Sequence, residues 1–400
     1  MVDEIALGDI YSLFVCYRLF RFTGGQTCKT LSLVTLLQWE VSFTMKSSVQ
    51  PDPIALLESR VGCEWPMIKR ARTTAIDKGK KLEAAIKGTS STDASLVVFG
   101  SLARKEWTNK SDVDWTLLID GQADPQHLEL TQTVASRLKK AKFSEPGATG
   151  IFGNMTFSHD VVQKIGGLAD TNENITRRVL LLQESVAFGK PDAHKRVMRL
   201  ILSRYLNDDR GFRFGSLPHK VPRFLLNDIV RYWRTVTVDF VEKQRGQAGQ
   251  GWGLRNAKLR MSRKLIFATG MLSCFSCEML STPNARNELR RHNSTVAMEE
   301  HLRTFIKKTP LEILATFLLE LKIKRKTVIK LFSSYDSFLR LLNNSAKRDH
   351  LKKLRPDDIP GDLVFREVRR FSREFQDGLT NLFFYENEKL QELTIFYGVF

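Results

Sequence analysis

The chain has 400 residues, of which 42% are hydrophobic, so it carries enough apolar material to build a core, and wholesale disorder is excluded. Its formal net charge of +18 favours anionic partners such as nucleotides, nucleic acid, acidic proteins or anionic membrane surfaces. Five scattered cysteines, an odd number, indicate a reducing compartment rather than a disulfide framework. No apolar stretch reaches the ~18 residues that span a bilayer. We therefore predict a cytoplasmic protein with no membrane association.

The N-terminal residues differ from the rest of the chain. Residues 1–44 mix Cys, Phe and Gly without a clear hydrophobic period, and we interpret them as an N-terminal extension. One hypothesis is that Met45 is the natural start of the protein. Residues 53–87 then place apolar residues at helical spacing among many lysines and arginines, which predicts one or two amphipathic helices.

Strand signals are concentrated between about residues 95 and 160. The runs "ASLVVFG" (94–100) and "DVDWTLLID" (112–120) predict two strands, and "GIFGNMTFS" (150–158) predicts a third. A helix is expected between them, over residues 125–141. From Asp160 onward the pattern is mostly helical. The expected helices cover residues 174–188, 191–207, 221–244, 257–280, 297–321, 324–344 and 365–393.

This order of elements predicts an α+β protein with two domains. An α/β domain over residues 45–210 is followed by an all-helical domain over residues 211–400. A lone C-x-x-C, Cys274 and Cys277, falls in one of the helices. Without a second pair or a histidine cluster, we interpret it as two small apolar residues on a helix face.

Two aspartates interrupt the second predicted strand. Asp112 and Asp114 are at positions i and i+2, so their side chains point to the same face, whereas Val113 and Trp115 point to the other. Adjacent carboxylates repel each other unless a cation lies between them. Mg²⁺ often binds through one or two carboxylates together with substrate phosphates. The alternative interpretation is a pair of solvated aspartates at a strand edge.

A Gly-Ser pair ends the preceding strand. Gly100 allows the backbone to approach a ligand closely, and exposed N–H groups with the Ser101 hydroxyl suit phosphate oxygens. The complete pattern is G-S-x10-D-x-D.

The stretch "FGSLARKEWTNKSDVDWTLLI" resembles the signature of nucleotidyltransferases of the DNA polymerase beta superfamily. It is most similar to the branch related to protein uridylyltransferases, and "DTNENITRRVLLLQESVAFGK" is loosely similar to a later segment of that branch. The resemblance implies a nucleotidyltransferase domain with a short mixed sheet. It also implies that Gly100 and Ser101 hold the β- and γ-phosphates of a nucleoside triphosphate, and that Asp112 and Asp114 bind two Mg²⁺ ions.

Many members of the superfamily use a third carboxylate on a later strand. Asp160, just after "NMTFSH", is the first candidate for this catalytic and metal-binding role, and Asp170 is the second. The alternative interpretation of Asp160 is an N-cap of the following helix.

Several basic residues are candidates for binding the nucleotide. Arg104 lies in the motif itself, and Arg177 and Arg178 precede an apolar run. Arg234 and Lys258 lie in the richest basic region, where a helix after the catalytic domain would neutralise the triphosphate. Each of them can instead belong to a solvated helix face.

We therefore expect a Mg²⁺-dependent transferase that moves a nucleoside monophosphate from a triphosphate, such as ATP, to an acceptor hydroxyl. The charge favours RNA or an acidic protein as the acceptor. The alternatives are a nucleotide- or RNA-binding protein without activity on the same fold, and a helical scaffold whose D-x-D is accidental.

Overall fold

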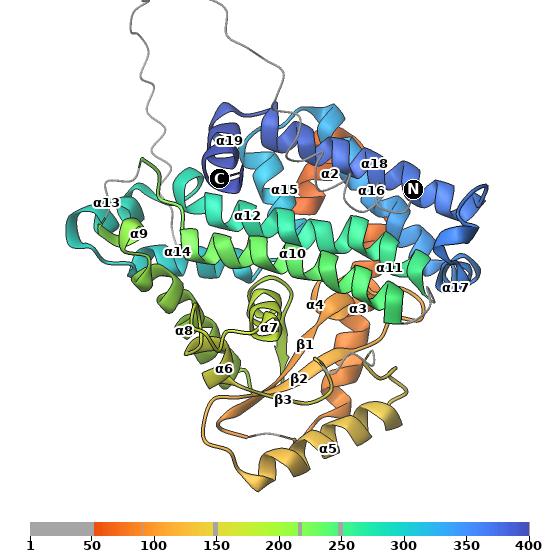
Figure 1. Ribbon diagram of the computed structural model, residues 1–400, viewed down its shortest axis with the longest axis horizontal. Helices are drawn as coiled ribbons and strands as arrows, with labels where there is room; N and C mark the ends of the chain where they lie inside the picture. Colours follow the sequence, from red (N-terminus) through yellow and green to blue (C-terminus); the bar gives the residue numbers. More distant parts are fainter. Residues whose placement is uncertain (1–51, 90, 147–150, 215–217, 247–250, 400) are drawn as a thin grey trace, which may run out of the picture. The chain divides into compact units, whose positions relative to one another are not determined.

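The first part of the chain contains a four-stranded mixed sheet (Figure 1). The computed structural model describes residues 52–89, 91–146, 151–214, 218–246 and 251–399, so the extension predicted for residues 1–44 and the proposed start at Met45 lie outside the described residues. The strands are β1 (Ala94–Phe99), β2 (Asp114–Ile119), β3 (Met155–Phe157) and β4 (Val186–Phe188), in the order β3-β2-β1-β4. β1 is antiparallel to both of its neighbours, and β2 is parallel to β3.

Helices cover both faces of the sheet, which explains why every residue of β1 is buried. Leu96, Val98 and Trp115 pack with residues of α3 and α5, whereas Val97 and Leu118 face the core that includes α7 and α8. The helices of this part are α2 (Pro53–Val61), α3 (Pro66–Ala85), α4 (Gly100–Ala103), α5 (Pro125–Lys140), α6 (Ser158–Val162), α7 (Asn172–Gln183), α8 (Asp192–Asp208) and α9 (Arg210–Phe214).

The remainder of the described chain is helical. Figure 1 shows α10 and α12 side by side, and α16 packs against α18. The elements are α10 (Arg223–Gly246), α11 (Trp252–Lys258), the π-helix η1 (Leu259–Arg263), α12 (Lys264–Met279), α13 (Pro283–His292), α14 (Val296–Ile306), α15 (Pro310–Glu320), α16 (Arg325–Asn343), α17 (Ser345–Lys353), the 3₁₀-helix η2 (Pro356–Asp358), α18 (Leu363–Phe384), α19 (Glu388–Leu393) and the π-helix η3 (Thr394–Val399).

The α+β class and the small mixed sheet are thus confirmed, while three expected helices are interrupted. Residues 297–321 form α14 and α15, because Thr309 caps a new helix that begins at Pro310, and residues 365–393 form α18 and α19, because Asn387 caps the second helix. The third interruption adds a strand. Residues 174–188 were expected to form a single helix, but α7 ends at Gln183 and β4 follows. Val186–Phe188 form a strand because their backbone pairs with Leu96–Val98 of β1, a long-range contact that overrides local helix propensity. One hydrophobic core contains residues from both sides of the boundary predicted at residue 210. The division there stays a prediction.

Within the described residues, no single helix is both long and apolar enough to cross a membrane. One pair of helical segments, Trp252–Met279 and Pro283–His292, meets the criterion jointly by length and composition, but the pair is bent by 76°. Its first segment contains α12, whose side chains are largely buried in the core. Cys274 and Cys277 lie in this helix, fully buried as free thiols.

A buried carboxylate joins the two parts of the fold. Asp336 of α16 accepts hydrogen bonds from the backbone N–H groups of Met67 (2.7 Å) and Ile68 (3.0 Å), at the start of α3. These N–H groups have no partner within their own helix. Asp336 therefore acts as an N-cap that is supplied from about 270 residues away along the chain.

We expect the substitution Asp336→Ala to lower the free energy of unfolding by about 1–2 kcal/mol, because the first turn of α3 loses its acceptor. Urea unfolding of both proteins measures the difference. The matched control is Asp377→Ala, which removes an exposed carboxylate paired with Lys330 at 3.4 Å and should cost about 1 kcal/mol or less. Equal losses in the two variants would contradict the capping role.

Candidate active site

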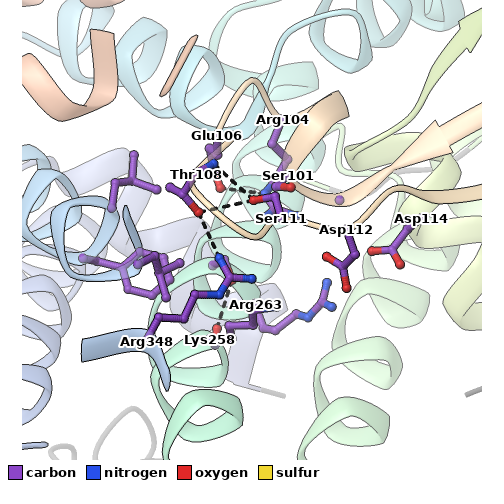
Figure 2. Close-up of a pocket in the computed structure, with 15 residues that line it drawn as sticks. Ser101, Arg104, Glu106, Thr108, Ser111, Asp112, Asp114, Lys258, Arg263 and Arg348 are labelled. Atoms are coloured by element: carbon purple, nitrogen blue, oxygen red, sulfur yellow. Dashed lines mark hydrogen bonds and ion pairs between the residues drawn. The ribbon is translucent and has the colours of Figure 1, made fainter. Parts of the chain in front are cut away.

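The two aspartates of the motif line one pocket together with the Gly-Ser pair (Figure 2). Asp114 is the first residue of β2, and Asp112 precedes it in the loop from β1. Val113 and Trp115 are buried on the opposite side, at 1% and 3% exposure. Alternation along the strand thus directs both carboxylates to the pocket and both apolar neighbours to the core.

Gly100 is required here for two independent reasons. Its φ of +68° is in the left-handed region that favours glycine. A Cβ at this position would also lie 2.8 Å from Asp114 Oδ2. The strand register, which pairs Phe99 with Asp114, creates this close approach. The hydroxyl of the adjacent Ser101 is buried and has no hydrogen-bond partner among the described residues.

The electrostatics of the aspartates favour a cation. Burial, and then the negative charge of Asp112, raise the pKa of Asp114 to about 6. A hard divalent ion would relieve both penalties, and Asp112, Asp114 and the Ser101 hydroxyl offer the oxygen ligands that such ions prefer. The described residues contain no group of three or more His, Cys, Asp or Glu arranged to hold a metal. Two carboxylates and a hydroxyl nevertheless fit Mg²⁺, which often binds through one or two carboxylates together with further oxygens.

Three cationic side chains from the helical part enter the same pocket: Lys258, Arg263 and Arg348. Lys258 ends α11 and Arg263 ends the π-helix η1. Residues five apart on an α-helix point in different directions, but the wider turn of a π-helix returns i and i+5 to one face. This local π turn explains why Lys258 and Arg263 line one pocket. Burial lowers the pKa of Lys258, while the charges of Asp112 and Asp114 oppose that shift.

Arg348 of α17 fixes the loop that carries Asp112. Its guanidinium donates to Thr108 Oγ1 (3.1 Å) and to the backbone carbonyls of Asn109 (2.8 Å) and Lys110 (2.7 Å). Arg348 is 3% exposed, and burial lowers its pKa. A residue 236 positions beyond Asp112 in the sequence thus orients the aspartate loop.

A layer of alternating charges supports the pocket. Arg104 pairs with Glu106 at 2.8 Å and with Glu184, and Glu184 pairs in turn with Arg263 at 3.5 Å. Arg104, Glu106 and Glu184 are all buried. Arg104, which was predicted to bind the nucleotide, lines the pocket but is engaged by two carboxylates. Its position is that of a support for Arg263.

The structure does not bring Asp160 to the pocket. It lies on α6, where it pairs with Lys164. Because β2 and β3 are parallel and Ile119 pairs with Phe157, the chain leaves β3 at the end of the sheet opposite to Asp114. The placement expected from the sequence is therefore corrected by the strand register.

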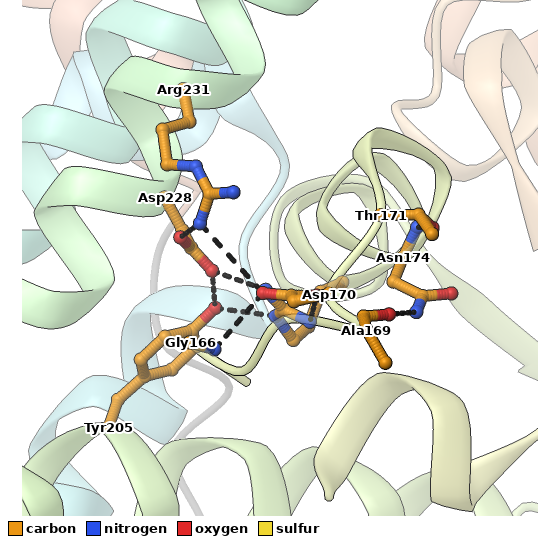
Figure 3. Close-up of polar contacts among 9 residues, drawn as sticks. Gly166, Ala169, Asp170, Thr171, Asn174, Tyr205, Asp228 and Arg231 are labelled. Carbon is orange, nitrogen blue, oxygen red and sulfur yellow. Dashed lines mark hydrogen bonds and ion pairs between the residues drawn. The ribbon is translucent and has the colours of Figure 1, made fainter. Parts of the chain in front are cut away.

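Asp170, the second candidate, belongs to a buried ion-pair cluster (Figure 3). Arg178 is fully buried and donates to both carboxylate oxygens of Asp170 (2.9 and 2.8 Å), to Asp228 of α10 and to the Tyr205 hydroxyl (2.7 Å). These contacts join α7, α8 and α10. Arg178 and Asp170 are thus structural residues in this arrangement, away from the aspartate pocket.

The two remaining predicted cations also lie outside the aspartate pocket. Arg177 pairs with Glu173 at 2.7 Å, one turn earlier on α7. Arg234 is exposed on α10. Of the predicted site residues, the structure brings together Gly100, Ser101, Arg104, Asp112, Asp114 and Lys258. The sequence did not predict Arg348 and Glu184. Both are charged and buried, and their burial is visible only in the folded chain.

A small mixed sheet with Asp112 and Asp114 at the start of β2, beside a Gly-Ser turn, is the arrangement expected of a nucleotidyltransferase domain. Residues 66–164 match the model of a family described as "Putative nucleotidyltransferase DUF294", which places this segment in the nucleotidyltransferase superfamily. The match supports the superfamily and does not single out the uridylyltransferase branch. A search of curated proteins returned no match.

The raised pKa of Asp114 predicts a pH dependence of stability. Between about pH 4 and pH 6, and without metal, Asp114 is protonated in the folded protein but ionised in the unfolded chain. The free energy of unfolding of the parent protein therefore falls as the pH rises through this range. Asp114→Asn lacks this penalty. We expect its free energy of unfolding to gain about 2–3 kcal/mol relative to the parent between pH 4 and pH 7. Denaturant titrations at several pH values test this, and a difference that does not vary with pH would contradict it.

Gly100→Ala should weaken Mg²⁺ binding in addition to costing stability. The left-handed backbone costs a residue with a Cβ about 1–2 kcal/mol, and the new methyl group would displace the Asp114 carboxylate. Gly88→Ala is the matched control, since Gly88 has φ +80° and nothing within 4 Å of its hypothetical Cβ. Calorimetric titration with Mg²⁺ should show a loss in the first variant alone. Equal Mg²⁺ affinity in both variants would refute the close-approach argument.

Proposed function

We propose that this protein transfers a nucleoside monophosphate from a nucleoside triphosphate to an acceptor hydroxyl and releases pyrophosphate. The observation that carries the proposal is the convergence of Asp112 and Asp114 with Gly100, Ser101 and three cationic side chains in one pocket. The match of residues 66–164 to a nucleotidyltransferase family supports the same class of chemistry.

Each group has a role that follows from its position. Asp112 and Asp114 would hold Mg²⁺, two ions in the arrangement expected from the resemblance, which supply charge neutralisation at the phosphates and an activated attacking oxygen. Gly100 lets the Asp114 carboxylate approach the backbone closely, and the Ser101 hydroxyl, which has no partner among the described residues, would donate to a phosphate oxygen. Lys258 and Arg263 would neutralise the negative charge of the transferred phosphate group in the transition state.

A protein that binds nucleotide without transferring it is the second candidate. It is favoured by the absence of a further uncommitted carboxylate from the pocket, as far as the structure describes it. The remaining acid there, Glu106, is already paired with Arg104. Calorimetry with each nucleoside triphosphate would distinguish the two, because tight binding that needs no Mg²⁺ and yields no pyrophosphate belongs to the second candidate.

The decisive experiment measures pyrophosphate release from ATP, CTP, GTP and UTP with Mg²⁺ in the presence of candidate acceptor pools. The double substitution Asp112→Asn with Asp114→Asn should reduce release by about 100-fold or more, since metal ions contribute several kcal/mol to such transition states. Asp160→Asn is the matched control and should change release by less than about twofold, because Asp160 lies at the opposite end of the sheet. Transfer that survives in the double variant would disprove the assignment.

A further inference from the structure

A second pocket adjoins the aspartate pocket and shares two of its cations, Lys258 and Arg263. Its volume is about 180 Å³. It lies between α7, α10, α11 and the residues that lead into β3. From these we infer that it binds the acceptor of the transfer reaction, and that the acceptor is a nucleoside phosphate, either free or at the end of an RNA chain. This inference rests on the proposed function.

The position follows from the sheet order. β2, with the aspartates, lies between β1, which leads into Gly100 and Ser101, and β3. The second pocket includes Phe152, and the next residue, Gly153, donates its N–H to the Trp115 carbonyl at 2.7 Å. The backbone of this segment therefore runs along the β3 side of the aspartates, from which the Phe152 ring reaches Phe99 with ring centroids 5.3 Å apart, whereas the Gly-Ser turn follows β1.

In-line transfer requires the acceptor and the leaving pyrophosphate to lie on opposite sides of the reacting phosphorus. The attacking and leaving oxygens lie roughly in line through the reacting phosphorus. If pyrophosphate leaves toward the Gly-Ser turn, the acceptor must enter from the other side of β2. Its hydroxyl oxygen forms a bond to the α-phosphorus while the bond to the bridging oxygen breaks. Pyrophosphate leaves with that electron pair, and the hydroxyl proton passes to solvent.

The lining defines the class of acceptor. Aromatic and aliphatic side chains form its walls, among them Phe152, Tyr232, Val236 and Phe240. Such walls suit a nucleobase, which stacks on aromatic rings. The residues of α10 recur at helical spacing, so one face of this helix forms a continuous wall.

The charges of the second pocket select an anion. Four of its lining residues are cations, namely Lys243, Arg255, Lys258 and Arg263, against the single carboxylate of Asp239 among those described. This excess disfavours a cationic acceptor and suits a phosphate beside the base. Pockets for whole drug-sized ligands have about 300–1,000 Å³, so about 180 Å³ holds the base and part of the ribose of one nucleotide rather than a longer segment.

The test uses the full chain with Mg²⁺ and a non-hydrolysable nucleoside triphosphate analogue at saturation, which fills the donor site. The probes are the ribonucleoside monophosphates and, in a separate arm, a short oligoribonucleotide. We expect the parent protein to bind at least one probe. Phe240→Ala should weaken that probe about tenfold, through lost stacking, and change the affinity for the analogue by less than about twofold.

Lys243→Gln is the second variant, since Phe240 is 6% exposed and its loss can impair folding. Lys243 is only half-buried, and its substitution should weaken the probe about threefold and reduce the salt dependence of binding. The matched control, Lys326→Gln, removes an exposed lysine of α16 that lines neither pocket, and should bind the probe like the parent.

The outcomes distinguish failure of the acceptor assignment from failure of the proposed function. A parent protein that binds the analogue with Mg²⁺ but none of the probes overturns the acceptor assignment alone. So does a Phe240→Ala variant that loses the analogue as strongly as the probe, because the pocket would then hold the base of the donor. Failure of the analogue to bind in the first titration overturns the proposed function itself. Equal affinity for monophosphate and oligonucleotide indicates a free nucleotide, and preference for the oligonucleotide indicates an RNA end.

Discussion

Electrostatic repulsion between the carboxylates of Asp112 and Asp114, at the start of β2, is the constraint on which the site depends. Burial and the neighbouring charge of Asp112 make ionisation of Asp114 unfavourable, as its pKa of about 6 shows. The cost corresponds to roughly 3 kcal/mol relative to a solvated aspartate. A divalent cation removes this cost by replacing the proton. Binding of such an ion would therefore be coupled to proton release from Asp114.

The cations around the aspartates come from segments far along the chain, which makes the helical part an integral half of the site. Arg348 of α17 holds the Asp112 loop, and Lys258 and Arg263 approach from α11 and η1. The π turn between them brings both side chains to one pocket, whereas an α-helical turn would direct one of the two elsewhere. Glu184 keeps Arg263 in place while its own charge is balanced by Arg104. Removal of one member would leave a buried charge unpaired, so the layer acts as a unit.

Much of the aspartate pocket was predictable from the sequence, because the signals for Gly100, Ser101, Asp112 and Asp114 are local. Alternation around Asp112 and Asp114 predicted a shared face, and Gly100 with Ser101 predicted a turn beside it. The placement of Asp160 was not predictable, since the end of the sheet at which a residue lies depends on whether β2 and β3 run parallel. Arg348 has basic neighbours on α17 in the sequence, and only its burial distinguishes it from them. β4 was missed for a related reason, since three residues of strand gain their stability from pairing with β1.

The aspartate pocket and the second pocket are built from different parts of the chain. The family match ends at residue 164 and includes β1, β2 and β3, which carry the Gly-Ser turn and the aspartates. The walls of the second pocket come mainly from α7, α10 and α11, beyond the matched segment. The proposed acceptor site thus lies mainly outside the segment that the family match covers. In this chain the residues leading into β3, from Ile151 to Asn154, contain no carboxylate. Under the proposed function, the acceptor would be selected mainly by the helical half, through the side chains of α10 and α11 that line the second pocket.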